Sequence, residues 1–67
     1  MSIELKKRDG FWSVDVIHFG KLYRRNFVYK NNAKMYRDML VGNFKRLKEE
    51  INRPSGLKEV TYISQNP

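Results

Sequence analysis

Four cationic side chains and a run of asparagines lie within residues 20–32, whose sequence is GKLYRRNFVYKNN. The cations are Lys21, Arg24, Arg25 and Lys30. Arginine can bind guanine O6 and N7 through two parallel hydrogen bonds, asparagine can do the same for adenine, and lysine attracts phosphate as a compact charge. Such a surface would hold a polyanion. The alternative is that these cations form a solvated coat on an edge strand, where charge prevents aggregation.

Positive charge is concentrated in the first two thirds of the chain. The 67 residues include 14 Lys and Arg against 7 Asp and Glu, for a net charge of +7. Residues 1–30 carry seven basic and three acidic side chains, residues 31–53 carry six and three, and residues 54–67 carry one of each. An excess of this size attracts polyanions at long range, and nucleic acid is the usual partner.

The residue types that catalysis and metal binding require are scarce. The chain has no cysteine, and His18 is its only histidine, so a zinc site of Cys and His ligands is excluded. Asp9, Asp15 and Asp38 are expected in a turn, on a sheet face and on a helix, where no two carboxylates converge for acid–base catalysis. No glycine-rich phosphate loop is present. The sequence therefore predicts a protein that is not an enzyme and uses no cofactor or metal.

The length and the distribution of apolar residues predict one small intracellular domain. The N-terminus lacks the apolar run of a signal peptide, and no stretch approaches the roughly 20 apolar residues that span a bilayer. The absence of cysteine fits a reducing compartment. We expect a cytoplasmic protein, free or associated with the nucleoid, that does not bind membranes and is a monomer or a weak dimer.

Alternating apolar and polar residues predict three strands in the first half of the chain. The second of them, FWSVDVIHF, is rich in the β-branched and aromatic residues that favour strands. Asp9-Gly10 and Gly20-Lys21 are expected to form the turns, because glycine tolerates the positive φ that a tight turn requires. Such short connections require antiparallel pairing. The predicted strands are residues 3–9, 11–19 and 22–29.

A helix is predicted behind the third strand. Asn31 or Asn32 is expected to cap its N-terminus, and Pro54 should end it by Asn52. Glu50 is expected on the solvated face of this helix together with the other charged residues. Apolar residues recur at spacings of three and four, as in a helix with one buried face. This stripe consists of Tyr36, Leu40, Phe44, Leu47 and Ile51.

The fold class that follows is α+β, with a three-stranded antiparallel sheet packed on one face by a C-terminal helix. Residues 1–53 would form this β-β-β-α domain, and residues 54–67 a C-terminal extension or an added short fourth strand. One helix can cover only one face of the sheet. The covered face would present Ile3, Leu5, Trp12, Val14, Val16 and Phe27. The uncovered face would present Lys6, Arg8, Phe11, Ser13, Asp15, Ile17, Leu22, Arg24 and Asn26.

The segment KKRDGFWSVDVIHFGKLYRRNFVYKNNAKMYRDML resembles the arm-type DNA-binding domain at the N-terminus of phage-type tyrosine recombinases. The likeness covers roughly residues 3–51 and consists of a pattern of turns and apolar spacing. The plant ethylene-response-factor type of DNA-binding domain has a similar layout. In both families the sheet lies in the DNA major groove with the helix behind it. The matching positions are Lys7, Arg8, Asp9-Gly10, Trp12, Val14, Val16, Gly20-Lys21, Arg24, Arg25, Phe27, Tyr36 and Leu40.

The resemblance implies a small DNA-binding module of a phage or mobile element. Because 67 residues cannot hold a recombinase catalytic domain, the module would be free-standing or the N-terminus of a longer protein. The sheet is expected to bind double-stranded DNA with two sets of side chains. Arg8, Ser13, Arg24 and Asn26 would face base edges, and Lys6, Lys7, Lys21, Arg25 and Lys30 would contact phosphates.

Two other functions fit the same residues. The first is an RNA-binding module in which Phe11 and Tyr23 stack on unpaired bases. The second is a small phage-type protein that binds and modulates a host protein, with Phe11, Ile17 and Leu22 as apolar anchors. The sequence leaves all three functions open.

Overall fold

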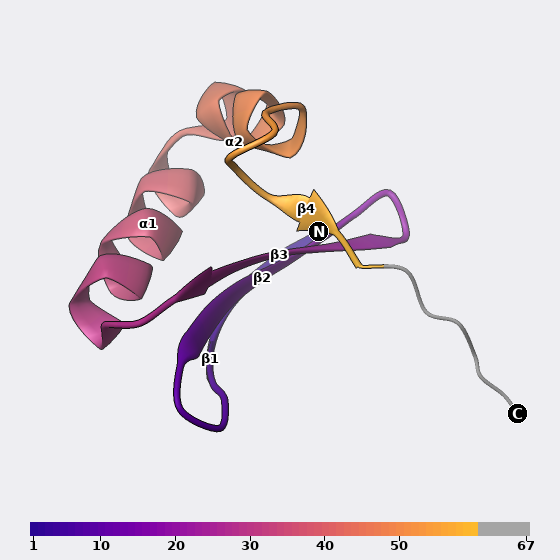
Figure 1. The fold of residues 1–67 in the computed structure, drawn as a ribbon. Helices are drawn as coiled ribbons and strands as arrows, with labels where there is room; N and C mark the ends of the chain where they lie inside the picture. Colours follow the sequence, from indigo (N-terminus) through magenta and orange to yellow (C-terminus); the bar gives the residue numbers. More distant parts are fainter. Residues whose placement is uncertain (61–67) are drawn as a thin grey trace, which may run out of the picture.

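Both helices in the described part of the chain lie on one side of a four-stranded antiparallel sheet (Figure 1). The computed structural model describes residues 1–60. The strand order in the sheet follows the sequence, β1-β2-β3-β4. This arrangement confirms the α+β class. The elements in chain order are β1 (Ser2–Lys7), β2 (Trp12–His18), β3 (Lys21–Phe27), α1 (Lys30–Gly42), α2 (Phe44–Ile51) and β4 (Lys58–Glu59).

The turn between β2 and β3 lies one residue earlier than predicted. Phe19 and Gly20 occupy its two positions, with φ of 52° and 74°, which is the left-handed geometry of a tight hairpin. As a result Asp15 of β2 pairs with Arg24 of β3. A turn at Gly20-Lys21 would have placed Asn26 opposite Asp15. Moving the turn by one residue changes the pairing of β2 with β3 by two residues. Every side chain therefore stays on its predicted face.

The prediction of one helix is not confirmed, because residues 1–60 form two. Asn43 has extended backbone angles (φ −147°, ψ 93°), and its side chain accepts a hydrogen bond from the Arg46 N–H at 3.0 Å. This bond caps α2 and fixes a new helical phase. Phe44 therefore leaves the buried stripe and is 54% exposed.

The predicted cap of the first helix is also wrong. Helix α1 begins at Lys30, and its N-cap position is Tyr29, whose side chain makes no capping hydrogen bond. Asn31 and Asn32 lie inside the first turn and are exposed. The apolar period of the sequence locates the helix but not its first residue, since several polar residues at the boundary satisfy the same pattern.

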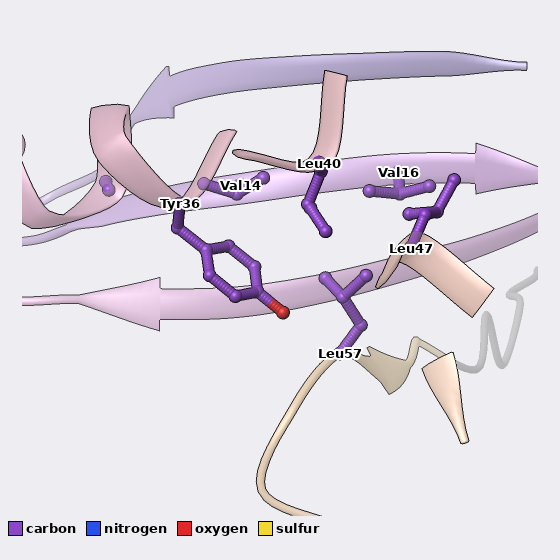
Figure 2. Packing of buried hydrophobic residues seen from close by; sticks show 7 residues of the cluster. Val14, Val16, Tyr36, Leu40, Leu47 and Leu57 are labelled. Carbon is purple, nitrogen blue, oxygen red and sulfur yellow. The ribbon is translucent and has the colours of Figure 1, made fainter. Parts of the chain in front are cut away.

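The core lies between the helices and the covered face of the sheet (Figure 2). Partly buried residues at its edge include Ile3, Leu5, Trp12 and Phe27, as the alternation of β1 to β3 predicted. Each fully buried valine or leucine side chain contributes roughly 1.5–3 kcal/mol of transfer free energy. The buried residues are Val14, Val16, Ala33, Tyr36, Leu40, Leu47 and Leu57.

The chain beyond α2 returns to the sheet and adds the short fourth strand. Residues Lys58 and Glu59 pair with Arg24 and Tyr23 of β3, and the Val60 N–H donates to the Leu22 carbonyl at 2.8 Å. The preceding segment is part of the core, since Leu57 is buried. The predicted extension thus contains the short fourth strand at Lys58–Glu59, and its residues 61–67 lie outside the described residues.

Glu50 holds the returning chain after α2 in place, although the sequence analysis expected this residue on the solvated face of the helix. That expectation is wrong, because Glu50 is 1% exposed. Its carboxylate accepts hydrogen bonds from the Tyr36 hydroxyl at 2.6 Å and from Arg53 at 2.9 Å. Its backbone oxygen accepts the Leu57 N–H at 2.9 Å. A Cβ atom at Gly56 would collide with that same oxygen, so the close approach requires glycine.

The surroundings of Glu50 keep its carboxyl group ionised. Burial alone would raise the pKa of Glu50, but the hydrogen bonds from Tyr36 and Arg53 and the charges of Arg53 and Arg46 outweigh burial and lower it below the ordinary value. Burial and the bond to Glu50 raise the pKa of the Tyr36 hydroxyl, which therefore stays protonated as the donor.

Candidate nucleic-acid interface

The face of the sheet opposite the helices carries polar and charged side chains. Within residues 1–60 no helix lies over it (Figure 1). We call this surface the open face. A shallow groove of about 360 Å³ runs along it across β1, β2 and β3. The side chains that line the groove are Ser2, Glu4, Lys6, Arg8, Asp15, Ile17, Leu22 and Arg24.

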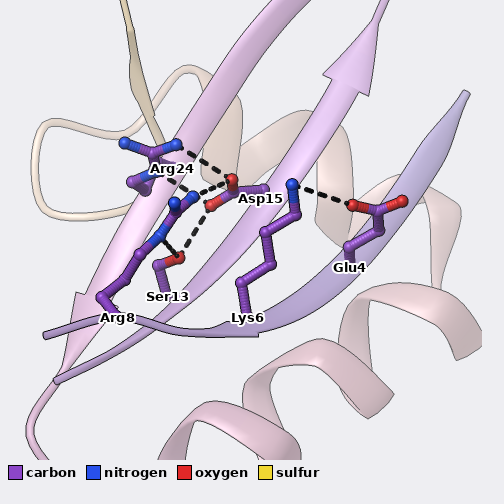
Figure 3. A network of polar contacts seen from close by, with 6 residues as sticks. All are labelled: Glu4, Lys6, Arg8, Ser13, Asp15 and Arg24. Carbon is purple, nitrogen blue, oxygen red and sulfur yellow. Dashed lines mark hydrogen bonds and ion pairs between the residues drawn. The ribbon is translucent and has the colours of Figure 1, made fainter.

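Asp15 is the centre of a hydrogen-bond network on the open face (Figure 3). Arg24 holds its carboxylate with two bonds, from Nε to Oδ1 at 2.9 Å and from Nη2 to Oδ2 at 3.0 Å. Arg8 donates Nη2 to Oδ2 at 2.7 Å, and the Ser13 hydroxyl donates to Oδ1 at 3.0 Å. Arg8 Nε also donates to Ser13 Oγ at 3.0 Å. Arg8, directly after β1, and Arg24 of β3 are therefore held by one carboxylate.

The network holds Asp15 in its charged form. The residue is 4% exposed, and burial alone would raise its pKa. Hydrogen bonds from Arg24 and Ser13 and the charges of Arg24 and Arg8 outweigh burial and hold the pKa of the carboxyl below its ordinary value. The buried negative charge is matched by two cations, so this part of the open face carries a net positive charge.

The two guanidinium groups remain accessible while their orientation is fixed. The side chains of Arg8 and Arg24 are 30% and 29% exposed. A long cationic side chain loses rotamer entropy when a ligand immobilises it. Asp15 and Ser13 already hold the Arg8 and Arg24 side chains in place. A ligand that binds these arginines therefore causes a smaller loss of rotamer entropy. The arrangement suits recognition of a planar acceptor group or of phosphate.

A second ion pair lies beside the network on β1. Lys6 Nζ lies 3.3 Å from Glu4 Oε1, and both side chains are about half exposed, at 46% and 55% (Figure 3). Such an exposed pair contributes little to stability. Glu4 does lower the positive potential of the open face, and alternation places it on this face with Lys6, although the site prediction omitted it.

The nine residues predicted to bind nucleic acid divide between the two faces. Lys6, Ser13, Arg24 and Asn26 belong to the open face by the register of the strands. Arg8 follows β1 and joins this face through its bonds to Ser13 and Asp15. Lys21 is exposed at the start of β3, where alternation places it on the same side as Tyr23 and Arg25. The remaining three, Lys7, Arg25 and Lys30, lie on the side of the helices.

The three cations on the helix side lie over aromatic rings. Lys7 and Lys30 have their Nζ atoms 5.9 Å and 5.3 Å from the centroid of the Trp12 ring. The Arg25 guanidinium lies 4.7 Å from the Tyr36 ring centroid, and its Nη1 lies 3.7 Å from Glu50. These are cation–π contacts that stabilise the domain. A ligand on the open face would not meet Arg25, which alternation places behind the sheet.

Ser13 requires a correction to its predicted role. It is fully buried, so its hydroxyl does not reach a base edge and instead orients Arg8 and Asp15. Asp15 itself is the residue that the site prediction omitted. Alternation had already placed Asp15 on this face, and the hairpin register decided its partner, since a turn at Phe19-Gly20 places Asp15 opposite Arg24.

The aromatic and apolar residues of the two alternative functions are not gathered on one surface. Tyr23 pairs with Val16 and packs against the core, so it does not share the open face with Phe11. Ile17 and Leu22 lie side by side at one end of β2 and β3. Phe11 precedes β2 at its other end, on the order of 20 Å away at about 3.3 Å per residue.

The part of the chain that is described shows neither a metal-ligand cluster nor a membrane-spanning helix. No three His, Cys, Asp or Glu side chains among residues 1–60 gather as metal ligands would. Neither described helix has both the length and the apolar character needed to cross a membrane. Comparison of the chain with protein-family models, curated proteins and solved structures finds no significant match. The resemblance to recombinase arm domains therefore stays a prediction.

Proposed function

We propose that the protein binds double-stranded DNA through the open face of its sheet, as a small module of phage or mobile-element type. The observation that carries the proposal is the Asp15 network, which presents Arg8, directly after β1, and Arg24 of β3 on a face that no described helix covers. The major groove admits a β-ribbon, and arginine is the commonest reader of guanine there.

The roles of the side chains follow from their positions. Arg24 and Arg8 contact guanine O6 and N7, and exposed Asn26 contacts a neighbouring base edge. Lys6 lies on β1 and lines the groove of the open face, where it contacts a phosphate. Asp15 and Ser13 position the arginines without touching DNA. The net charge of +7 attracts the duplex over longer distances.

The direct test is a salt titration of binding to a mixed-sequence duplex. Affinity should fall steeply as salt rises from about 50 mM to about 200 mM, because each phosphate contact releases counterions. A protein that shows no measurable affinity for duplex DNA at about 50 mM salt does not have the proposed function. Competition with single-stranded RNA distinguishes the RNA-binding alternative, in which RNA would displace the duplex readily.

Two charge-matched pairs of variants distinguish the open face from general attraction. The variant Lys6→Gln should weaken binding and lower the salt dependence, whereas Lys45→Gln on α2 removes the same charge away from the proposed interface. Glu4→Gln should strengthen binding, because it removes a negative charge from the groove, and Glu49→Gln on α2 is its control. Equal effects within each pair would contradict binding through the open face.

A further inference from the structure

Two apolar side chains interrupt the charged surface of the open face. Ile17 of β2 and Leu22 of β3 are directly opposed in the register, one pair beyond Asp15 and Arg24 on the same face. Ile17 is 47% exposed and Leu22 is half-buried. Both line the same groove as Arg8 and Arg24. The helices lie on the other side of the sheet, so neither helix buries this pair (Figure 1).

The chemistry of the major groove offers one apolar group to such a pair. The edges of adenine, guanine and cytosine present hydrogen-bond donors and acceptors, and thymine adds a 5-methyl group. Resting on the proposed function, we infer that Ile17 and Leu22 contact a thymine methyl group and that the open face therefore selects thymine near the guanine bound by its arginines. This contact gives the apolar pair a part in sequence recognition.

The distance along the strands between the Asp15–Arg24 pair and the Ile17–Leu22 pair matches the spacing of DNA bases. Ile17 follows Asp15 by two residues, and Leu22 precedes Arg24 by two. Two residues of an antiparallel strand span about 6.8 Å, and two base steps along one DNA strand also span about 6.8 Å. With β2 and β3 running along the groove, the thymine lies about two base steps from the guanine.

The same pair is too small for the alternative of a protein anchor. A stable protein interface buries about 800 Å² on each partner around a cluster of apolar residues. Phe11, the third anchor that the sequence suggested, lies at the opposite end of β2, and the Asp15 network lies between. Two aliphatic side chains next to two fixed arginines fit a ligand that combines a methyl group with hydrogen-bond acceptors.

The experiment begins with selection from a random duplex pool at low salt. The selected duplex is then prepared in two forms, with thymine and with deoxyuridine, which differ only by the 5-methyl group. Replacing thymine should lower the affinity about fourfold, the effect expected when one methyl group is no longer buried. Ile17→Ala should reduce the difference between the two forms, and Ile17→Ala/Leu22→Ala should bind both equally, at the affinity of the wild type for the deoxyuridine form. Val41→Ala removes an exposed aliphatic group from α1 and should preserve the difference.

The Ile17 methyl resonances give a second readout that does not depend on a variant. They should shift more on binding the thymine duplex than on binding the deoxyuridine duplex. Equal affinity for the two forms, or a selected pool without thymine enrichment, overturns the thymine contact and leaves the proposed function standing. Absence of any duplex binding overturns both. An Ile17→Ala variant that loses affinity for both forms by the same factor, and so keeps the full difference between them, also contradicts a role in methyl recognition.

Discussion

Arg24 and Arg25 are adjacent in the sequence, yet their side chains lie on opposite faces of the sheet. The Arg24 guanidinium binds Asp15 on the open face at 2.9 Å and 3.0 Å. The Arg25 guanidinium lies behind the sheet, 5.0 Å from the Phe27 ring centroid and 4.7 Å from that of Tyr36. Alternation along β3 separates them, so two residues of identical chemistry have different roles.

Neutralising each arginine in turn should separate recognition from folding. Arg24→Gln should weaken DNA binding about tenfold or more, because glutamine cannot form the bidentate pair with guanine. Arg25→Gln should lower the free energy of unfolding by about 1 kcal/mol through its cation–π contacts and change DNA affinity far less. The measurements are duplex titrations of folded protein and urea denaturation. Since both variants remove one positive charge, equal losses of affinity would mean that only net charge matters.

Acid should unfold the protein through Asp15 and Glu50. Both carboxyl groups have a lower pKa in the folded state than in the unfolded chain, so the unfolded state binds more protons as the pH falls. The stabilisation is fully present above the unfolded pKa values of about 4 and is lost as the pH falls through the lower, folded values. Thermal melts across this range measure the loss.

Substitution of Asp15 provides the control for this acid dependence. Asp15→Asn should be less stable at neutral pH, by about 1–3 kcal/mol, because Arg8 and Arg24 lose a charged acceptor. Its stability should also depend less on pH in the acidic range. If the stability of the variant depended on pH as steeply as that of the wild type, the Asp15 carboxylate would not be a source of the acid dependence.

Gly56 is expected to be intolerant of a side chain, in contrast to Gly42. A Cβ at Gly56 would collide with the Glu50 carbonyl oxygen, which is backbone and cannot turn aside. Gly56→Ala should therefore destabilise the protein by about 1–3 kcal/mol, as overpacking does. Gly42 has nothing within 4 Å of such an atom and lies at the end of α1. Gly42→Ala should be neutral or stabilising by up to about 1 kcal/mol. Denaturation midpoints of the two variants test the contrast.

Phe19 should be replaceable with a gain in stability. Its φ of 52° lies in the left-handed region, which costs a residue with a Cβ roughly 1–2 kcal/mol, and its side chain is 89% exposed. Asparagine tolerates this conformation and favours the two-residue hairpin turn. Phe19→Asn should therefore raise the unfolding midpoint. Phe19→Gly should also raise it, because glycine adopts this φ without strain. Phe19→Ala keeps the Cβ and should bring little gain; if alanine stabilised as much as asparagine, backbone strain would not be the cause.

The strands and the two faces of the sheet were readable from the sequence because they depend on local alternation. Val14 and Val16 had to share one face, and Asp15 had to point the other way, whatever the partner strands were. A shift of two residues in the hairpin preserved these faces, so the misplaced turn did not alter the predicted core. The open face and the buried apolar set could thus be predicted before the strand partners were known.

The tertiary structure decided which side chains meet. The position of the turn made Arg24 rather than Asn26 the partner of Asp15, and this created the arginine network. The break at Asn43 changed the helical phase, which exposed Phe44. Glu50 is buried because its partner Tyr36 comes from another helix and its backbone contact comes from the returning chain. Such contacts join residues distant in sequence, and a local period carries no information about the registers that bring them together.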